Sequence, residues 1–381
     1  MLTPSPAKLT RENLTAYVQA ILDPDLKTDL PKLKCPPFNV SRYEYLQTAP
    51  SYSSTDPPLR YFFALNLRNC LPVLPRLLAS ILQAILFLGP SHCALSIVEG
   101  NSPDGTAELL AALEPSLTTL GIRTHFALNT TPNPLAPGAD RFSTLAHLRN
   151  LALLPLTTNP TDYHPADTTV AFINDVALCP DDILELLHQK TQQKADMACA
   201  LDWTGGPPAG PVFYDVYVAR AANGDLFFDV PPDTVSWARA GELFWNEPVA
   251  RERYERRESF QVFACWNGAV VFTARPLVQG RVGFRGARRD RGECHAGEPQ
   301  LFCKDLWREG YGRIMVVPTV SLEYDEDAGA AVKGLRGFTA ALVAEETGRE
   351  TGIEWMPPPD LVKCMPTFND QSWRPWNETL V

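Results

Sequence analysis

The sequence has no apolar run long enough to cross a membrane. Its most apolar stretch, Leu77 to Leu88, covers about twelve residues and contains Gln83, whereas a membrane span needs roughly 20 residues. The N-terminus also lacks the apolar core of a signal peptide. We therefore expect either a cytosolic protein or a catalytic chain whose membrane anchor lies upstream of the sequence.

Several motifs that identify common enzyme classes are missing. The nine cysteines form no CxxC pair, which argues against a zinc site. The chain has no P-loop, no GxGxxG and no serine-hydrolase elbow. A net charge of −10 argues against non-specific nucleic-acid binding, which requires clustered Lys and Arg. We expect no nucleic-acid partner.

The composition that remains is that of a globular protein with long connections. Of 381 residues, 45% are hydrophobic and 20% are charged, an ordinary balance for a folded domain. The 35 prolines predict irregular connecting segments. Four sequons begin at Asn13, Asn39, Asn129 and Asn377, and they are compatible with a lumenal location.

Apolar strands alternate with helical patterns from residue 60 onward. Strands are predicted at 61–67, 93–98, 123–128 and 169–175, and helices at 74–88, 106–120, 142–154 and 181–194. This alternation predicts an α/β fold with a mostly parallel central sheet flanked by helices. Ligands of such sheets bind beyond the carboxyl ends of the strands.

The pattern is weaker after residue 200. We predict strands at 212–220, 269–273 and 314–318, a solvated helix over 251–258, and helices at 298–308 and 340–346. Three segments follow: an N-terminal stem and linker at 1–58, a catalytic domain at 59–327, and a C-terminal helix with a Pro/Trp-rich tail at 328–381.

An acidic residue ends the strand predicted at 169–175. Asn174 and Asp175 follow the apolar run Val170 to Ile173. A carboxylate at a strand end suits a hard cation that bridges the phosphates of a nucleotide sugar. Ala177 stands where a second acid of a DxD motif would be, so Asn174 or a distant residue would complete the metal shell. A helix cap or loop acid is the alternative.

Other polar residues at strand ends and on the helix before Asp175 suit a nucleotide sugar. An acid after the second strand can accept hydrogen bonds from a base or ribose, and arginine forks match phosphate oxygens. A turn or a surface arginine is the alternative in each case. The donor-binding candidates are Asn66, Glu99, Asp104, Arg141, Arg149, Asn150 and Asn174.

Two later segments carry groups that suit sugar chemistry. Trp266 and Asn267 combine an aromatic face with an amide, as sugar sites do, although a buried Trp at a tight turn has the same pattern. Glu293 and Glu298 could supply a carboxylate near the anomeric carbon, or could cap the helix that begins near Pro299.

Taken together, nine short segments resemble the fungal capsule-associated mannosyltransferases, glycosyltransferase family 69. They are Val98–Thr106, Leu148–Ala152, Phe172–Val176, Ala200–Trp203, Phe213–Arg220, Cys265–Gly268, Glu298–Trp307, Gly310–Pro318 and Leu322–Tyr324. Each is weak alone, but their order and number make the resemblance specific over residues 60–325.

The resemblance implies a GT-A-like fold and a retaining α-mannosyltransferase that moves mannose from GDP-mannose to a mannose-containing glycan, through an α-1,3 or α-1,2 linkage. It also implies a divalent metal, Mn²⁺ or Mg²⁺, held by Asp175. The catalytic residues would be Asp175, Glu293 and Glu298, and the acceptor would meet Asp202, Trp203, Asp215, Trp266 and Asn267. The family further implies a type II membrane protein with its catalytic domain in the Golgi lumen, anchored by a segment absent from this chain.

Two other functions stay open at this point. A transferase could use another donor, such as UDP-xylose or UDP-galactose. A sugar-binding protein without catalysis is the second alternative, and the missing second acid of the DxD motif motivates it.

Overall fold

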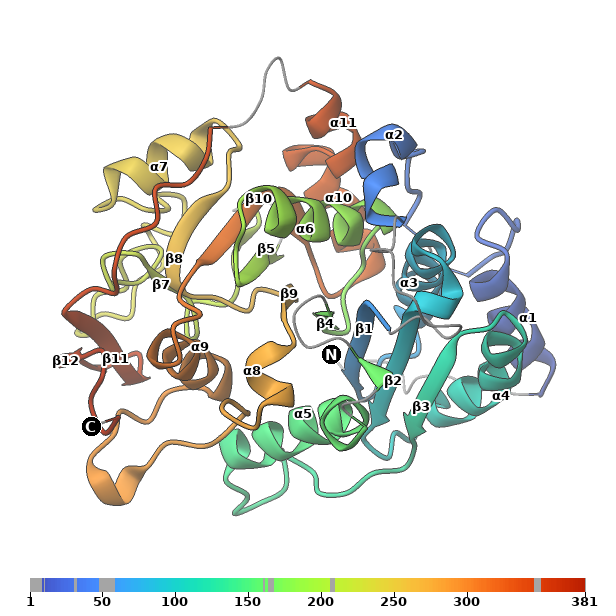
Figure 1. The fold of residues 1–381 in the computed structure, drawn as a ribbon, viewed down its shortest axis with the longest axis horizontal. Coiled ribbons are helices and arrows are strands. Elements are labelled where there is room, and N and C mark those ends of the chain that lie inside the picture. The colour runs from blue at the N-terminus through green and yellow to red at the C-terminus, as the bar shows by residue number, and fades with distance from the viewer. Residues whose placement is uncertain are drawn as a thin grey trace.

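A computed structural model of the chain describes residues 9, 11–30, 33–47, 59–159, 162–163, 168–205, 210–345 and 351–380 (Figure 1). Ten of its strands form one sheet, in the order β3-β2-β1-β4-β9-β5-β10-β8-β7, with β6 paired to β5. The strands are β1 Tyr61–Leu67, β2 Cys93–Glu99, β3 Arg123–Ala127, β4 Thr169–Ile173, β5 Met197–Thr204, β6 Val212–Phe213, β7 Arg220–Ala221, β8 Phe260–Ala264, β9 Ala269–Thr273 and β10 Ile314–Leu322.

Most of the strands point the same way. β3, β2, β1 and β4 are parallel neighbours. β9 is antiparallel to both β4 and β5, so β5 again points in the direction of β4, and β10 is parallel to β5. The predicted α/β fold with a mostly parallel central sheet flanked by helices is confirmed. Its consequence is that the carboxyl ends of β1, β2, β4, β5 and β10 lie at one edge of the sheet.

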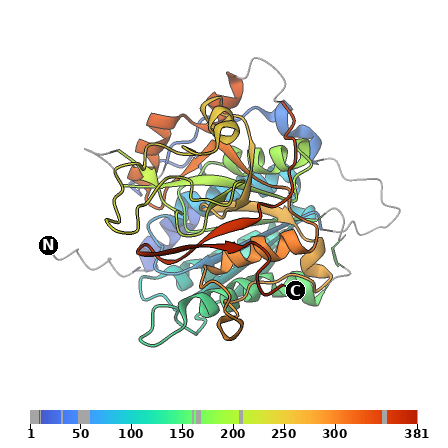
Figure 2. The same ribbon diagram turned by 90° about the vertical axis from the view of Figure 1, so that its left-hand side faces the viewer.

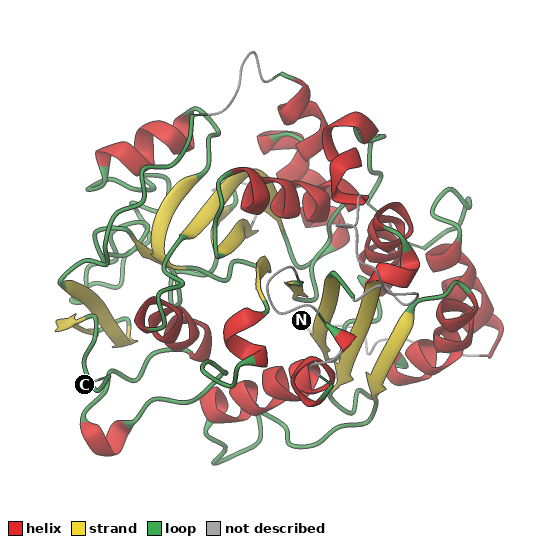
Figure 3. Ribbon diagram, viewed as in Figure 1, coloured by secondary structure: helices red, strands yellow, loops and turns green. Residues whose placement is uncertain are grey.

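Helices cover both faces of the sheet (Figures 1 and 3). α5 (Arg141–Thr158) packs on β1 and β2 and touches α8 (Arg275–Val278) and α9 (Glu298–Arg308) on one face. α3 (Leu74–Leu88) and α6 (Pro180–Gln192) pack together on the other face. The remaining helices are α1 Arg11–Leu22, α2 Val40–Tyr43, α4 Thr106–Thr119, α7 Pro248–Glu255, α10 Glu326–Arg336 and α11 Thr339–Ala344, and the 3-10 turns include Glu44–Gln47, Pro90–His92 and Arg289–Arg291.

Alternation along each strand divides the core in two. In β1, Phe62 and Ala64 belong to the core beneath α5, whereas Tyr61, Phe63 and Leu65 belong to the core beneath α3 and α6. Successive strand side chains point to opposite faces, and all five are buried because helices cover both faces.

Three features of the second half differ from the predictions. The strand predicted at 212–220 is wrong: only 212–213 and 220–221 are extended, because residues 215–219 form a turn in which Val218 and Ala219 donate to the carbonyl of Asp215. Strand β8 was not predicted. The tail contains an unpredicted hairpin, β11 (Leu361–Thr367) and β12 (Asp370–Pro375), which Figure 2 shows beside the larger sheet.

The N-terminal segment packs on the body through α1, which contacts α3 and α4. A disulfide between Cys35 and Cys179 also joins it to the start of α6. Two more disulfides link Cys199 to Cys265 and Cys294 to Cys364. The division at 58 and 327 stays a prediction, and α10 runs across the second of these boundaries.

No helix in the described part of the chain combines the length and the apolar character that a membrane crossing requires.

Candidate functional site

Polar residues gather where the parallel strands end. Asn66 is the penultimate residue of β1, Glu99 is the last residue of β2, and Asn174 and Asp175 follow β4. On the other side of β9, Asp202 of β5 pairs in register with Leu322 of β10. We call this group of strand ends the carboxyl edge.

Asp175 is half-buried at this edge. Burial raises the pKa of its carboxyl group to about 6, and the nearby charge of Arg149 opposes that rise. Its neighbour Asn174 is fixed on both sides: its N–H donates to the Gly268 carbonyl at 2.8 Å, and its Oδ1 accepts from Trp266 Nε1 at 3.1 Å. The strand end therefore holds Asp175 on a well-defined backbone.

Asp202 is fully buried and lies near a second carboxylate, Asp215. Burial, and then the charge of Asp215, raise the pKa of Asp202 well above its ordinary value. Its Oδ2 accepts from the Tyr324 hydroxyl at 2.7 Å, and among the described residues its buried Oδ1 has no hydrogen-bond partner. Burial raises the pKa of Asp215 to about 6. A buried carboxylate oxygen without a hydrogen-bond partner lowers the stability of the fold, and a ligand that donates to Asp202 Oδ1 would remove that cost.

Arg149 is the cation of this acidic group. Its Nε donates to Glu298 Oε1 at 2.9 Å, and only 12% of the Arg149 side chain and 3% of the Glu298 side chain are exposed. The guanidinium also lies 4.4 Å from the ring centroid of Trp266. The pair joins α5 to the first residue of α9, so two helices distant in sequence meet at the site.

The turn between β8 and β9 completes the edge. Asn267 has a φ of 51° and Gly268 a φ of 81°, values that Asn and Gly tolerate better than other residues. The Asn267 N–H donates to Asp215 Oδ2 at 2.9 Å, and its Nδ2 donates to the Ala200 carbonyl. A Cβ on Gly268 would lie 3.3 Å from the Cβ of Asp202. This turn therefore brings the chain close to both acids.

Glu99 and Asp104 shape the loop that follows β2. The carboxylate of Glu99 accepts from the N–H groups of Asn101, Ser102 and Asn129. Asp104 accepts from the N–H groups of Leu71 and Thr106, and also from the Thr106 hydroxyl. Both carboxylates are buried and already accept hydrogen bonds from the loops around them. They therefore fix the loop conformation and do not offer a free carboxylate to a ligand.

Asn66 is a better candidate for direct contact with a ligand. Neither Oδ1 nor Nδ2 of its buried amide has a partner among the described residues. Arg68, two residues later, has the same property at Nε and Nη1, and a Cβ on Gly100 would lie 3.3 Å from the Cβ of Arg68. The predictions omitted Arg68, and also Tyr324, which binds Asp202. The signal for both is in the sequence, since Arg68 directly follows β1 and Tyr324 follows the last residue of β10 by two positions.

The structure does not bring every predicted residue into this group. Glu293 lies in a separate ion-pair network, in which Arg285 and Lys304 hold the pKa of its carboxyl group at about 2. Asn150 binds the backbone of Phe284 in both directions. Arg141 is exposed at the start of α5.

The two tryptophans predicted at the acceptor site are buried. Trp203 and Trp266 are each 1% exposed. Arg336 covers the Trp203 ring at 3.1 Å from its centroid, and Arg149 covers Trp266. Neither indole presents an open face to a sugar. The indole of Trp266 instead positions Asn174 and Arg149. The acceptor-binding role of Trp203 and Trp266 stays a prediction.

A divalent metal fits this edge only in an open arrangement. Within the described ranges, no three His, Cys, Asp or Glu side chains are grouped to hold a metal by themselves. Mg²⁺ and similar cations often bind through one or two carboxylates together with substrate phosphates and water. Asp175, half-buried at a strand end, and the unsatisfied Oδ1 of Asp202 are compatible with that mode of binding.

Comparison with known proteins assigns the chain to a family. A family model described as cryptococcal mannosyltransferase 1 matches residues 60–305. An alpha-1,3-mannosyltransferase of Cryptococcus neoformans is 35% identical over 337 residues, covering 84% of this chain and 71% of that protein. The chain belongs to the cryptococcal mannosyltransferase family. The predicted resemblance is thus confirmed, and membership supports glycosyl transfer as the class of reaction.

Two groups of solved structures are also similar. Staphylococcus aureus TarS with UDP has 14% identity and a TM-score of 0.38, covering 77% of this chain and 68% of TarS. The Pyrobaculum calidifontis mannosyltransferase PcManGT, with GDP-mannose and Mn²⁺, has 13% identity and a TM-score of 0.39, covering 81% and 66%. Likenesses this weak carry no argument about the site of this chain.

Proposed function

We propose that this family member transfers mannose from GDP-mannose to a mannose-containing glycan, with retention and with the help of Mn²⁺ or Mg²⁺. Family membership supports the transferred sugar. The observation that carries the site is the grouping of Asp175, Asp202, Asp215 and Glu298 around Arg149 at one sheet edge. Such edges bind nucleotide ligands in parallel α/β sheets.

In this proposal Asp175 holds the metal, which when bound offsets the charge that develops on the departing diphosphate. Asn66 and Arg68 offer unsatisfied donors to the nucleotide portion. The hydrogen-bonded backbones of Asn174 and Asn267 fix the two turns that carry the acids, so the site needs little rearrangement as charge develops.

Glu298 and Asp215 place negative charge where a positively polarised sugar carbon needs it. Arg149 donates to Glu298 and lowers the cost of holding its carboxylate in a buried position. With retention, the acceptor hydroxyl would attack from the face of the leaving group. The bond formed would be an α-1,3 or an α-1,2 linkage.

We further propose that the chain works in the Golgi lumen as the catalytic part of a type II membrane protein. Two observations support a location in the secretory pathway. Three disulfides link six of the nine cysteines, and such bonds persist in oxidising compartments. The four sequon asparagines, Asn13, Asn39, Asn129 and Asn377, are all exposed.

The test is nucleotide release from a panel of GDP- and UDP-sugars, with and without a mannoside acceptor, in Mn²⁺ and in EDTA. We expect acceptor-stimulated release of GDP from GDP-mannose alone, abolished by EDTA. Release from a UDP-sugar instead would overturn the donor assignment. Folded protein that releases no nucleotide from any donor would favour a sugar-binding protein without catalysis.

A further inference from the structure

A cavity lies at the opposite edge of the same sheet. It has a volume of 450 Å³ and is lined by residues that include Arg60, Tyr61, Thr169, Lys190, Lys194 and Arg275. We call it the amino-edge cavity. None of its lining residues belongs to the carboxyl edge, and its size is within the range of small-molecule sites, roughly 300–1,000 Å³.

The strand register builds the floor of this cavity. Tyr61, the first residue of β1, pairs with Thr169, the first residue of β4, and Thr169 pairs with Thr273, the last residue of antiparallel β9. Residues paired in register project from the same face of a sheet. A phenol and two hydroxyls therefore lie side by side, and the end of α6 supplies the wall above them.

The wall is strongly basic, although the chain has a net charge of −10. Four cations, Arg60, Lys190, Lys194 and Arg275, line the cavity with a single carboxylate, Asp196, which leaves a local charge of +3 (4 − 1). One oxygen of Asp196 already accepts from the N–H of Arg313. This concentration of positive charge is the opposite of the chain as a whole.

Three of these cations lack a carboxylate at ion-pair distance within the described part of the chain: Lys190, Lys194 and Arg275. The Nζ of Lys190 donates to the Thr169 hydroxyl at 3.3 Å. Burial lowers the pKa of Lys190 to about 8. The charge of Asp196 partly offsets this effect. Asp196 is not within ion-pair distance of the ammonium, however, so a bound anion at that distance would compensate Lys190 more fully.

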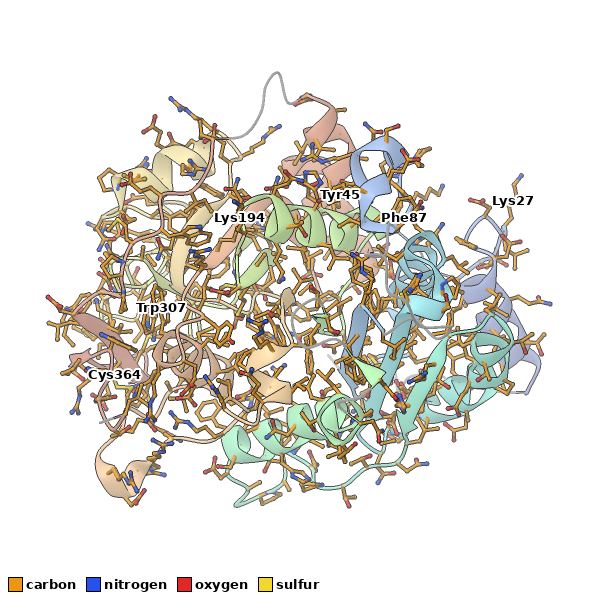
Figure 4. All side chains as sticks on the ribbon, in the orientation of Figure 1. Lys27, Tyr45, Phe87, Lys194, Trp307 and Cys364 are labelled. Atoms are coloured by element: carbon orange, nitrogen blue, oxygen red, sulfur yellow. A yellow bond between two sulfur atoms is a disulfide. The ribbon has the colours of Figure 1, made fainter. Side chains whose placement is uncertain are left out.

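The rest of the lining suits a sugar. Tyr45 and Tyr311 contribute aromatic rings that are at least partly exposed, and Thr169, Thr191 and Thr273 contribute hydroxyls. Tyr61 is buried and donates to the Leu46 carbonyl, so it supports the floor from below. Rings pack against the apolar faces of sugars, while hydroxyls exchange hydrogen bonds with sugar hydroxyls. Tyr45 and Lys194, two of the lining residues, are both labelled beside α6 in Figure 4.

We propose that the amino-edge cavity binds a small anionic sugar, a saccharide that carries a phosphate or a carboxylate group. The cations pair with the acidic group, and Tyr45, Tyr311 and the threonines contact the ring. This site is separate from the proposed transfer site and does not depend on which donor that site uses. It gives the protein a second contact for charged glycans or their precursors.

The experiment is isothermal titration calorimetry with mannose 6-phosphate, glucuronate, mannose and inorganic phosphate. The variant is Lys194→Asn with Arg275→Gln. Both side chains are exposed, and Asn suits the φ of 53° at position 194. The control, Lys27→Gln with Arg256→Gln, removes two exposed cations outside the cavity. Lys27 lies at the right-hand edge of Figure 4, away from Tyr45 and Lys194.

We expect mannose 6-phosphate or glucuronate to bind the wild type more tightly than mannose or inorganic phosphate do. The better of the two identifies phosphate or carboxylate as the recognised group. Affinity should fall about tenfold or more in the cavity variant, the effect of losing a charge-assisted contact, and stay within about twofold in the control. A sugar that binds at the carboxyl edge instead would bind the cavity variant as tightly as the wild type. An affinity that is the same in the cavity variant and the wild type would therefore overturn the proposal. Equal binding of mannose or of inorganic phosphate would overturn it as well.

Discussion

The two edges of the central sheet carry opposite charge. At the carboxyl edge, Asp175, Asp202 and Asp215 lie close together, and Arg149 is bound to Glu298. At the amino edge, four cations face one acid. The same strand, β4, has Thr169 at one end and Asp175 just beyond the other. One sheet therefore presents an acidic site suited to cations and their phosphate partners and a basic site suited to anions.

Helix α6 repeats this contrast along its own length. Asp181 and Asp182 are in its first turn, and Lys190 is in its last turn. Acids near the start and bases near the end of a helix complement its dipole. However, each end also holds a charge that burial opposes, since burial raises the pKa of Asp181 to about 7 and lowers that of Lys190 to about 8.

The largest expected effect comes from the acid that defines the carboxyl edge. Asp175→Asn keeps the shape of the side chain but removes its charge. We expect nucleotide release to fall about 10³-fold or more, because a metal would lose its carboxylate ligand. Asp233→Asn, at an exposed position, serves as the control. Activity within about tenfold of wild type in Asp175→Asn would show that this edge is not the metal site.

The next effect concerns the buried ion pair. Glu298→Gln keeps an oxygen for Arg149 Nε but removes the negative charge beside the sugar. We expect kcat to fall about 10²-fold with little change in the KM for the donor, the pattern of a group that acts mainly in the transition state. Kinetics against donor concentration checks this, with exposed Glu252→Gln as the control. A rise in KM alone would assign Glu298 to donor binding.

A smaller effect tests the acidic end of α6. Asp181 is fully buried; its Oδ2 accepts from the Ala340 N–H, and its Oδ1 has no partner among the described residues. Its pKa is about 7 in the folded state, against an ordinary value of 3.8 for this carboxyl group. The folded state thus binds this proton more tightly, and stability is lost as pH rises through 7.

Asp181→Asn removes that loss. We expect its Tm to exceed that of wild type at pH 8 by a few degrees, roughly 2–5 °C, and the gap to shrink toward pH 5. Thermal unfolding across this range measures it. A gap that does not change with pH would mean that Asp181 ionises at its ordinary pKa.

The smallest effect tests the basic end of the same helix and has the opposite sign. The pKa of Lys190 is about 8 in the folded state, against an ordinary value of 10.5, so stability is lost as pH falls through 8. Lys190→Met should raise the Tm by roughly 1–3 °C at pH 7, and the gain should shrink toward pH 10. A lower Tm at pH 7 would mean that the bond from Lys190 to Thr169 outweighs the cost of burial.

The first half of the fold could be predicted closely from the sequence. β1, β2 and α3 begin and end within about one residue of the predicted bounds, because each buried strand is a continuous apolar run and Gly89, with a φ of 97°, ends the helix. Tertiary contacts decide the second half. Residues 212–220 alternate as a strand would, yet Asp215 turns the chain to accept from the Asn267 N–H, 52 residues away.

The site could be predicted in part for the same reason. Asp175 and Asn66 were found because strand ends converge in parallel sheets. Sequence could not show that Glu99 is occupied by three backbone N–H groups, that Glu293 is paired with Arg285 and Lys304, or that Trp203 is covered by Arg336. Each of these facts depends on contacts between distant segments.

The disulfide between Cys35 and Cys179 would keep the products of proteolytic cleavage together. Cys179 is four residues after Asp175, so the bond ties the N-terminal segment to the loop of the candidate metal site. A protease cut anywhere between these two cysteines would leave the fragments covalently joined. Such a nicked protein would migrate as one band on a non-reducing gel and as two on a reducing gel, and it could pass for intact enzyme until a thiol released the smaller piece.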